Sequence, residues 1–581
     1  MNSFTAHEMK GVGSTQDSRR SEPELGSEDI QSVHSLEVER RGGRFREYRA
    51  PREHGEAFVQ PAFDQALSTL QANQRLLAKQ TIFEAIRLQA RRQMIEDALR
   101  YTSVYRTPEW LAGLSVDELL ERPIVMAGHQ PALFHPGVWF KNFALSHVAQ
   151  QTGALAINLV IDNDVASGSS IRVPTLASET AQASYVPVPF DDAGGGVPYE
   201  QTTIQNRDVF EHFSQRVTET VAPIVQKPCV DRLWHHARAA IERCGVAGCA
   251  MAQARHGLEG ELGLQTLELP LGVVCRTTAF AEFVLSILSE LPRFHQCYNG
   301  AANQYRREHG IRSTAHPVPN LDEQDGWFEA PLWVYGNQSP ARRPVWVRLR
   351  DDQLVISDRV ERELEIDIRF PKLAAEKLNS TITPEFKLRP RALLTTMYAR
   401  LILSDLFMHG IGGAKYDQLS DHIIHTFFMV DPPDFMVMSA TVKLPMDHAL
   451  DHSTRVRQLK RELRDTQYQP ERFAKVADLD PSLIARKQHL LDNQPPPGAR
   501  GQWHREITEI TQELSDCLED QRSRIATELV NARRQASSEA ILSSREHPFC
   551  VFSLQHLQNT FSKLLEQPAV ADQRAVTDQP S

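Results

Sequence analysis

The sequence has no apolar run long enough to cross a membrane, since a spanning helix needs roughly 20 consecutive apolar residues. Residues 1–20 are polar and lack the apolar segment of a secretory signal peptide. Cysteine is scarce: the chain has seven cysteines, and no two of them have the CxxC spacing. These absences predict a reduced, cytoplasmic protein that does not contact a membrane.

A surplus of basic residues is also missing. The formal net charge is −10, which argues against a general nucleic-acid-binding surface. We therefore expect a small-molecule substrate and no nucleic-acid partner. The length of 581 residues exceeds one ordinary hydrophobic core and predicts two or three domains.

Three common catalytic signatures are absent as well. The chain has no GxxxxGK[ST] phosphate loop, no GxGxxG dinucleotide loop and no GxSxG nucleophile elbow. A group of histidines and cysteines in the middle of the chain has a spacing that fits no common zinc finger or ribbon: His235, His236, Cys244, Cys249 and His256. We therefore assign no metal site, and whether a metal takes part stays open.

A strand, a polar loop and a helix follow one another in the first half of the chain. The apolar run 124–127 ends at a loop with Gly128, His129, Gln130 and His135, and Pro136 and Gly137 then open a helix that carries Lys141. A helix start offers free N–H groups and a positive dipole end to an anion. The pattern predicts ligand contact here, with His129, Gln130 and His135 as candidate catalytic residues. Helix capping is the structural alternative.

A second predicted strand, 154–161, ends in Asp162, Asn163 and Asp164. Ligands of open α/β sheets bind in the crevice at the carboxyl ends of the strands. We therefore expect the acidic tip to face the histidine-bearing loop and to hold an ammonium, a ribose or Mg²⁺. An Asx-rich turn that merely ends the strand is the alternative.

Two later stretches complete the predicted binding site. Arg389 lies in the segment 386–394 and could hold a carboxylate or phosphate, or pair with a structural acid. Downstream, Gly412 and Gly413 open a helix and are followed by Lys415 and Tyr416. Glycines before a helix allow a ligand to approach the backbone closely.

The pattern along the chain predicts an α/β fold with the following parts. We expect a disordered tail at 1–50, a helical segment at 51–122, a core at 123–313 and 359–445 with an antiparallel β insertion at 314–358, a helical arm at 446–545 and a C-terminal segment and tail at 546–581. Within the arm, the apolar residues of 503–536 recur with a heptad-like period, and Pro495, Pro496 and Pro497 break the helix before it. The arm is therefore predicted to be an antiparallel hairpin.

Four stretches, in order, resemble the bacillithiol synthase family of cysteine-adding enzymes. They are 128–137 (GHQPALFHPG), 159–164 (LVIDND), 298–306 (YNGAANQYR) and 388–416, from LRPRALL to GGAKY. This chain has His129 at the first glutamine of the family's Gly-Gln-Gln loop, Asn163 between its two aspartates, and Ala414-Lys415-Tyr416 in place of Pro-Gly-Glu.

The resemblance implies a Rossmann-like core, a coiled-coil arm that supports a homodimer, and a reaction that joins the carboxyl of cysteine to the amine of glucosaminyl-malate. Amide formation from a free carboxylate needs activation, so we expect ATP or ADP as the nucleotide. Two alternatives remain open at this point: a non-catalytic small-molecule-binding or assembly protein on the same fold, and a nucleotidyltransferase that releases pyrophosphate.

Overall fold

The computed structural model describes residues 45–177, 182–446 and 452–566. The chain divides into two compact units, Met1–Arg46 and Glu47–Ser581, and the fold below belongs to the second. Most of the predicted N-terminal tail and the predicted C-terminal tail lie outside the described residues. Across those three ranges the protein has a mixed α/β fold, as expected, and none of its helices is long and apolar enough to cross a membrane.

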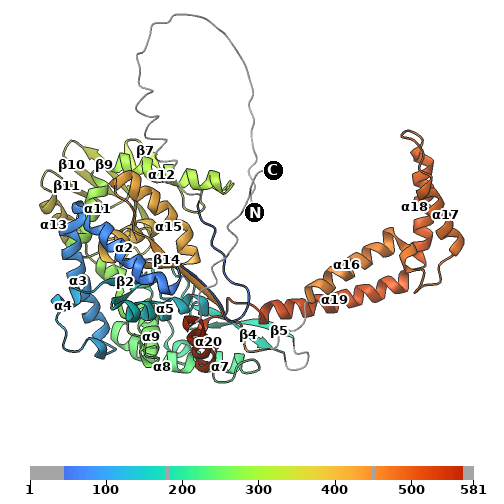
Figure 1. The fold of residues 1–581 in the computed structure, drawn as a ribbon, viewed down its shortest axis with the longest axis horizontal. Helices are drawn as coiled ribbons and strands as arrows, with labels where there is room; N and C mark the ends of the chain where they lie inside the picture. The colour runs from blue at the N-terminus through green and yellow to red at the C-terminus, as the bar shows by residue number, and fades with distance from the viewer. Residues whose placement is uncertain (1–44, 178–181, 447–451, 567–581) are drawn as a thin grey trace, which may run out of the picture. The chain divides into compact units, whose positions relative to one another are not determined.

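In the described residues the main sheet has six strands in the order β1-β14-β13-β2-β3-β6. Two of them, β2 and β14, are labelled in Figure 1. Their bounds are β1 Glu56–Gln60, β2 Ile124–His129, β3 Leu155–Val160, β6 Leu267–Pro270, β13 Leu406–Gly410 and β14 Phe435–Thr441. All neighbours are parallel except the edge strand β1, which pairs antiparallel with β14. The carboxyl ends of the five parallel strands therefore lie along one edge of the sheet.

Helices cover both faces of this sheet. Helix α5 (Pro136–Thr152) joins β2 to β3 and packs on one face with Val125 and Met408, and α15 (Ile411–Ile423) packs on the other through Ala414 and Val437. Every residue of β3 is buried, as expected for a parallel strand with both faces covered. Helix α5 begins where His135 caps it and ends at Gly153, which adopts the left-handed conformation that glycine favours.

The segment expected to be helical, 51–122, contributes a strand as well as helices. The strand is β1, and the helices are α2 (Ala66–Ala78), α3 (Glu84–Ser103) and α4 (Val116–Leu120). Strand β1 exists because its backbone pairs with β14, from which it is separated by most of the chain. Helix α2 is fixed to the core by Asn73, whose amide donates to the carbonyls of Asp405 and Asp434.

The second sheet is antiparallel and larger than the sequence suggested. Its path is β11-β10-β9-β8-β12, with β7 paired to β8. The bounds are β7 Glu323–Gln324, β8 Trp327–Tyr335, β9 Arg343–Arg350, β10 Gln353–Ser357, β11 Glu363–Asp367 and β12 Lys387–Pro390. The sheet thus continues past the expected end at residue 358 and recruits β12, where Arg389 lies opposite Trp333.

The other elements connect these sheets. They are β4 (Ser170–Leu176) and β5 (Ala183–Pro189), which form a two-stranded sheet, and the helices α6 (Arg207–Glu211), α7 (Phe213–Val221), α8 (Val230–Cys244), α9 (Ala247–Glu261), α10 (Leu271–Val274), α11 (Thr278–Leu288), α12 (Leu291–Glu308), α13 (Pro371–Thr381), α14 (Ala392–Tyr398) and α20 (Leu554–Glu566). Helix α20 brings the chain back to the core, where Phe561 packs against Phe140 and Phe143 of α5.

In its described residues, the segment predicted to be a helical arm has four α-helices rather than two. They are α16 (His452–Tyr468), α17 (Pro481–Asp492), α18 (Arg500–Asp516) and α19 (Glu519–Leu542). Helices α16 and α19 run antiparallel, because Leu459 packs with Ile525 and Leu529 while His452 bonds to Glu539 further along α19. The residues between α17 and α18 include the proline run that was expected to break the helix.

Candidate functional site

A cavity of about 420 Å³ lies at the carboxyl ends of β3 and β6, and we call it the β3–β6 pocket. Its wall carries two carboxylates, three cationic side chains and two thiols. These are Asp162, Glu200, Arg276, Lys387, Arg389, Cys244 and Cys249. The pocket is thus built where the main sheet, the start of α9 and strand β12 of the second sheet meet.

Asp162 follows β3 directly and carries the most perturbed carboxyl of the pocket wall. The backbone N–H of Gly272 donates to its Oδ1 at 2.9 Å. Burial and the neighbouring carboxylate of Glu200 raise the pKa of Asp162 to about 7. A carboxyl that is half ionised near neutrality, in a cavity, is suited to take up or release a proton during a reaction.

Glu200 and Arg389 form a buried ion pair beside Asp162. The guanidinium donates to both carboxylate oxygens, at 2.9 and 3.0 Å, and the hydroxyl of Tyr335 donates to Oε1 at 2.6 Å. Burial by itself would raise the pKa of Glu200, but Arg389 and its other donors hold it below the ordinary value. Glu200 therefore stays ionised, and Arg389 is occupied by a structural acid rather than free for a ligand.

Two further cations are closer to the solvent side of the pocket. Lys387 lies 3.7 Å from Glu200, and burial lowers its pKa. Arg276 is exposed and makes no side-chain hydrogen bond or ion pair with any residue that the structure describes. Arg276 is therefore the guanidinium of the pocket wall that a carboxylate ligand can reach without breaking an existing pair.

The loop of residues 128–135, here called the His129 loop, touches the acidic tip of β3. The amide of Gln130 donates to Asp164 Oδ2 at 2.9 Å, and Arg342 lies 3.3 Å from Oδ1 of the same carboxylate. Asn163 turns elsewhere: it is buried and donates to the carbonyl of Pro390. Asp162 thus faces the β3–β6 pocket, Asn163 faces strand β12, and Asp164 faces the His129 loop.

The two histidines of this loop have different surroundings. The ring of His129 packs edge-on against Phe134, and burial together with Lys141 lowers its pKa to about 3. His129 is therefore neutral at physiological pH. His135 caps α5, since its Nδ1 accepts from the N–H of Gly137 at 3.1 Å. One ring nitrogen of His135 is thus already engaged.

The first turn of α5 is closed by packing. A Cβ at Gly137 would overlap the carbonyl oxygen of Ala440, so the backbone of β14 occupies the space beside it. Lys141 lies inside the protein, donates to the carbonyl of Gly128, and has a pKa that burial lowers to about 7. The glycine and the lysine therefore position the backbone of the His129 loop in this structure.

The first turn of α15 is open by contrast. Apart from the backbone of the helix itself, no atom of the described residues lies within 4 Å of a Cβ placed at Gly412, and none of their side chains caps the helix at Gly410. A Cβ at Gly413 would come 2.9 Å from His409 Nδ1, so that glycine allows His409 to pack under the turn. Lys415 and Tyr416 follow and are partly exposed. The first N–H groups of a helix can in general bind an anion such as a phosphate.

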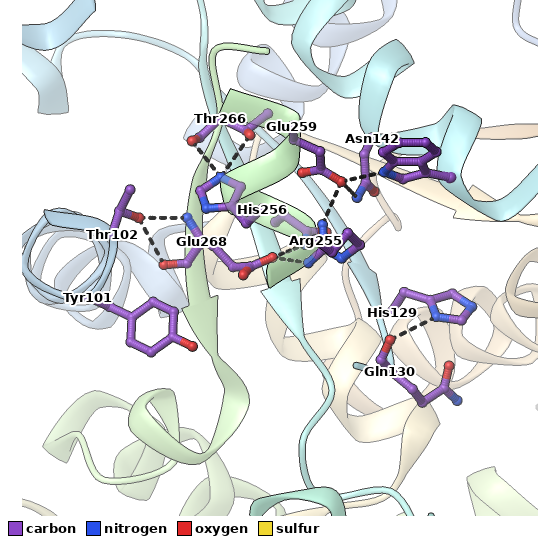
Figure 2. A network of polar contacts seen from close by, with 12 residues as sticks. Tyr101, Thr102, His129, Gln130, Asn142, Arg255, His256, Glu259, Thr266 and Glu268 are labelled. Atoms are coloured by element: carbon purple, nitrogen blue, oxygen red, sulfur yellow. Dashed lines mark hydrogen bonds and ion pairs between the residues drawn. The ribbon is translucent and has the colours of Figure 1, made fainter. Parts of the chain in front are cut away.

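A buried polar network supports the strands behind these sites (Figure 2). Arg255 of α9 lies between the carboxylates of Glu259 and Glu268. Glu259 also accepts from Asn142 at 2.7 Å and from the indole of Trp139 at 2.8 Å. Burial raises the pKa of Glu268 to about 6. The network ties α5, α9 and β6 together.

Sequence reasoning missed several residues of the β3–β6 pocket. Lys387 could have been predicted from the sequence, because residues two apart on a strand share a face and Lys387 precedes Arg389 by two. Glu200 and Arg276 could not have been predicted in this way, since each lies in a connection whose place depends on the tertiary fold.

The part of the chain that the structure describes has no group of three histidine, cysteine or acidic residues able to hold a metal ion. Neither the family models nor the curated proteins that were compared with the sequence match this chain.

Proposed function

We propose that this protein is an enzyme that joins a carboxylate to an amine, in the manner of the bacillithiol synthases that its motifs resemble. The observation that carries the proposal is the Asp162 carboxyl, which stands at the wall of a cavity with a pKa raised to about 7. An amine nucleophile must lose a proton as the amide bond forms. A carboxylate with this pKa can accept that proton near neutral pH.

The topology of the main sheet supports this proposal. In chain order its parallel strands are β2, β3, β6, β13 and β14, so their spatial order corresponds to 3-2-1-4-5. This is the order of a Rossmann-like sheet, in which ligands bind at the strand ends where the order reverses. The reversal falls between β2 and β13, so we place a nucleotide, ATP or ADP, near the His129 loop and the open first turn of α15.

In this proposal the two regions have separate tasks. The N–H groups at Gly412 and Gly413 bind phosphate, with Lys415 beside them, and Gln130 links the His129 loop to Asp164. The amine substrate enters the β3–β6 pocket, where Asp162 receives its proton and Arg276 binds a carboxylate of the substrate. The ion pair of Glu200 and Arg389 positions Asp162 and takes no part in the proton transfer.

The test is a coupling assay with purified full-length protein, cysteine, glucosaminyl-malate and ATP or ADP. We expect the amide product by mass spectrometry and a large loss of rate in Asp162→Asn. Asp192→Asn is the matched control, because Asp192 is an exposed aspartate outside the pocket. No product with any amino sugar or amino acid, and no heat stabilisation of the protein by these compounds at millimolar concentration, would refute the proposal.

We further propose that the arm is a coiled coil through which two copies of the chain associate. Its inner seam is already filled by Leu459, Ile525 and Leu529, while Val476 and Val530 are exposed apolar residues on its surface. Light scattering should give the mass of a dimer for the full chain and of a monomer after deletion of 452–542. A monomer mass for the full chain, or a dimer mass after the deletion, would refute the role of the arm.

A further inference from the structure

Two of the cysteines stand together at the wall of the β3–β6 pocket. Cys244 is the last residue of α8, and Cys249 lies in the first turn of α9. Gly245 adopts a left-handed conformation between them, so the chain reverses and the two helices pack side by side. Both side chains are partly exposed and both line the cavity.

The two thiols line the same wall of the cavity and interact with each other. Cys249 Sγ accepts a hydrogen bond from Gln253 Nε2 at 3.4 Å and lies 3.7 Å from the hydroxyl of Tyr101, while Cys244 Sγ donates to the carbonyl oxygens of Ala240 and Val246, at 3.1 and 3.5 Å. The interaction between the two thiols lowers the pKa of Cys244 to about 7 and raises that of Cys249. Cys244 is therefore the nucleophile of the pair at neutral pH, and Cys249 is held as a thiol beside it.

The remaining cysteines lack this combination of contact and access. Burial raises the pKa values of Cys229, Cys275 and Cys550, and all three side chains are enclosed in the protein. Cys517 is exposed, but it lies on the arm between α18 and α19 with its thiol bonded to the carbonyl of Glu513. Cys297 of α12 is partly exposed and does not line the β3–β6 pocket. Cys244 and Cys249 thus differ from the other cysteines because their two thiols share the wall of one accessible cavity.

We propose that Cys244 and Cys249 form a dithiol site that a small-molecule disulfide entering the β3–β6 pocket oxidises to an intramolecular disulfide. The Cys244 thiolate attacks one sulfur of the small disulfide and expels the other half as a thiolate, which leaves a mixed disulfide on Cys244. Cys249 then loses its proton and attacks the Cys244 sulfur, and the second half departs as a thiolate. The protein loses two electrons and two protons in total, and the small disulfide becomes two thiols.

This inference does not depend on the proposed ligase activity, because it concerns the reaction of the side chains themselves. Oxidation would nevertheless change the pocket, since both sulfurs belong to the wall that also carries Asp162. A reversible bond at this place would couple the redox state of the surroundings to the occupancy of the pocket.

The experiment uses the reduced full-length protein and glutathione disulfide near pH 7.5. After free thiols are blocked with N-ethylmaleimide, trypsin cuts after Arg243 and Arg255 and releases a peptide, 244–255, that contains both cysteines and no other. We expect this peptide to carry no N-ethylmaleimide and to have the mass of its unmodified sequence less two hydrogen atoms, whereas the reduced peptide carries two N-ethylmaleimide groups. Treatment with dithiothreitol before the blocking step should restore the doubly labelled peptide. The reaction should be severalfold faster at Cys244 than at Cys517.

Two variants separate the steps. Cys249→Ser should accumulate a stable glutathione adduct on Cys244, because the resolving thiol is gone, whereas Cys244→Ser should leave Cys249 unmodified. Cys517→Ser is the matched control and should behave like the unaltered protein. Circular dichroism establishes that each variant is folded. The proposal is overturned if peptide 244–255 stays fully reduced, or if folded Cys249→Ser retains no adduct on Cys244.

Discussion

Replacement of Arg389 by methionine tests how the β3–β6 pocket is held together. The guanidinium is only 3% exposed and its partner Glu200 only 13%, so the substitution leaves a carboxylate in a nearly dry place next to Asp162. Removal of one partner from a buried pair typically costs about 3–5 kcal/mol. Lys387 and Tyr335 remain beside Glu200 and compensate in part, so we expect a loss of about 3 kcal/mol in the free energy of unfolding.

Urea unfolding followed by far-UV circular dichroism measures this loss from the transition midpoint. The matched control is Arg207→Met, which removes an exposed pair with Glu242 and should cost at most about 1 kcal/mol. The double variant Arg389→Met/Glu200→Gln should recover most of the stability, because it removes the unpaired charge.

A second readout distinguishes an electrostatic role of Arg389 from a purely steric one. The guanidinium lowers the pKa of Asp162, so its removal should shift that pKa further upward. In a titration of the folded variant, Asp162 should then ionise at a higher pH than in the unaltered protein. A single variant as stable as the control, or a double variant no better than the single one, would show that the pair does not have the assigned role.

Three further predictions concern neighbouring features. The coupling rate should rise as pH passes about 7, because Asp162 must be ionised to accept a proton. Since the folded pKa of Asp162 is raised, its contribution to the free energy of unfolding falls as pH rises from 4 to 7. This decrease should be absent from the pH-dependent unfolding of Asp162→Asn. Arg255→Met should cost about 3–5 kcal/mol in urea unfolding, and more at pH 8 than at pH 5, because burial raises the pKa of Glu268 to about 6 and its ionised carboxylate would then lack its partner. Gly137→Ala should lower stability by about 1–3 kcal/mol through overlap with the backbone of β14, whereas Gly412→Ala, in open space, should change the unfolding midpoint little.

Local sequence patterns were sufficient for the strands, the loop and the helix starts around the predicted site. The apolar run before Gly128 and the one before Asp162 are strands β2 and β3, and the helix expected at Pro136 begins there. The expectation that the His129 loop meets the acidic tip also agrees with the contact between Gln130 and Asp164. These features follow from hydrophobic runs, helix capping and the geometry of consecutive parallel strands, which act over a few dozen residues.

The pocket depends on contacts between distant parts of the chain. Asp162, Glu200 and Arg389 come from three segments that only the packing of the two sheets brings together, with nearly 190 positions between Glu200 and Arg389. Their pKa values depend on burial and on each other, so the residue types alone carried no sign of which carboxyl would be protonated near neutrality. Sequence therefore determined the α/β elements and the polar ends of their strands, because these depend on local periodicity. Tertiary structure decided which of those polar groups share a cavity, because desolvation and charge pairing act through space rather than along the chain.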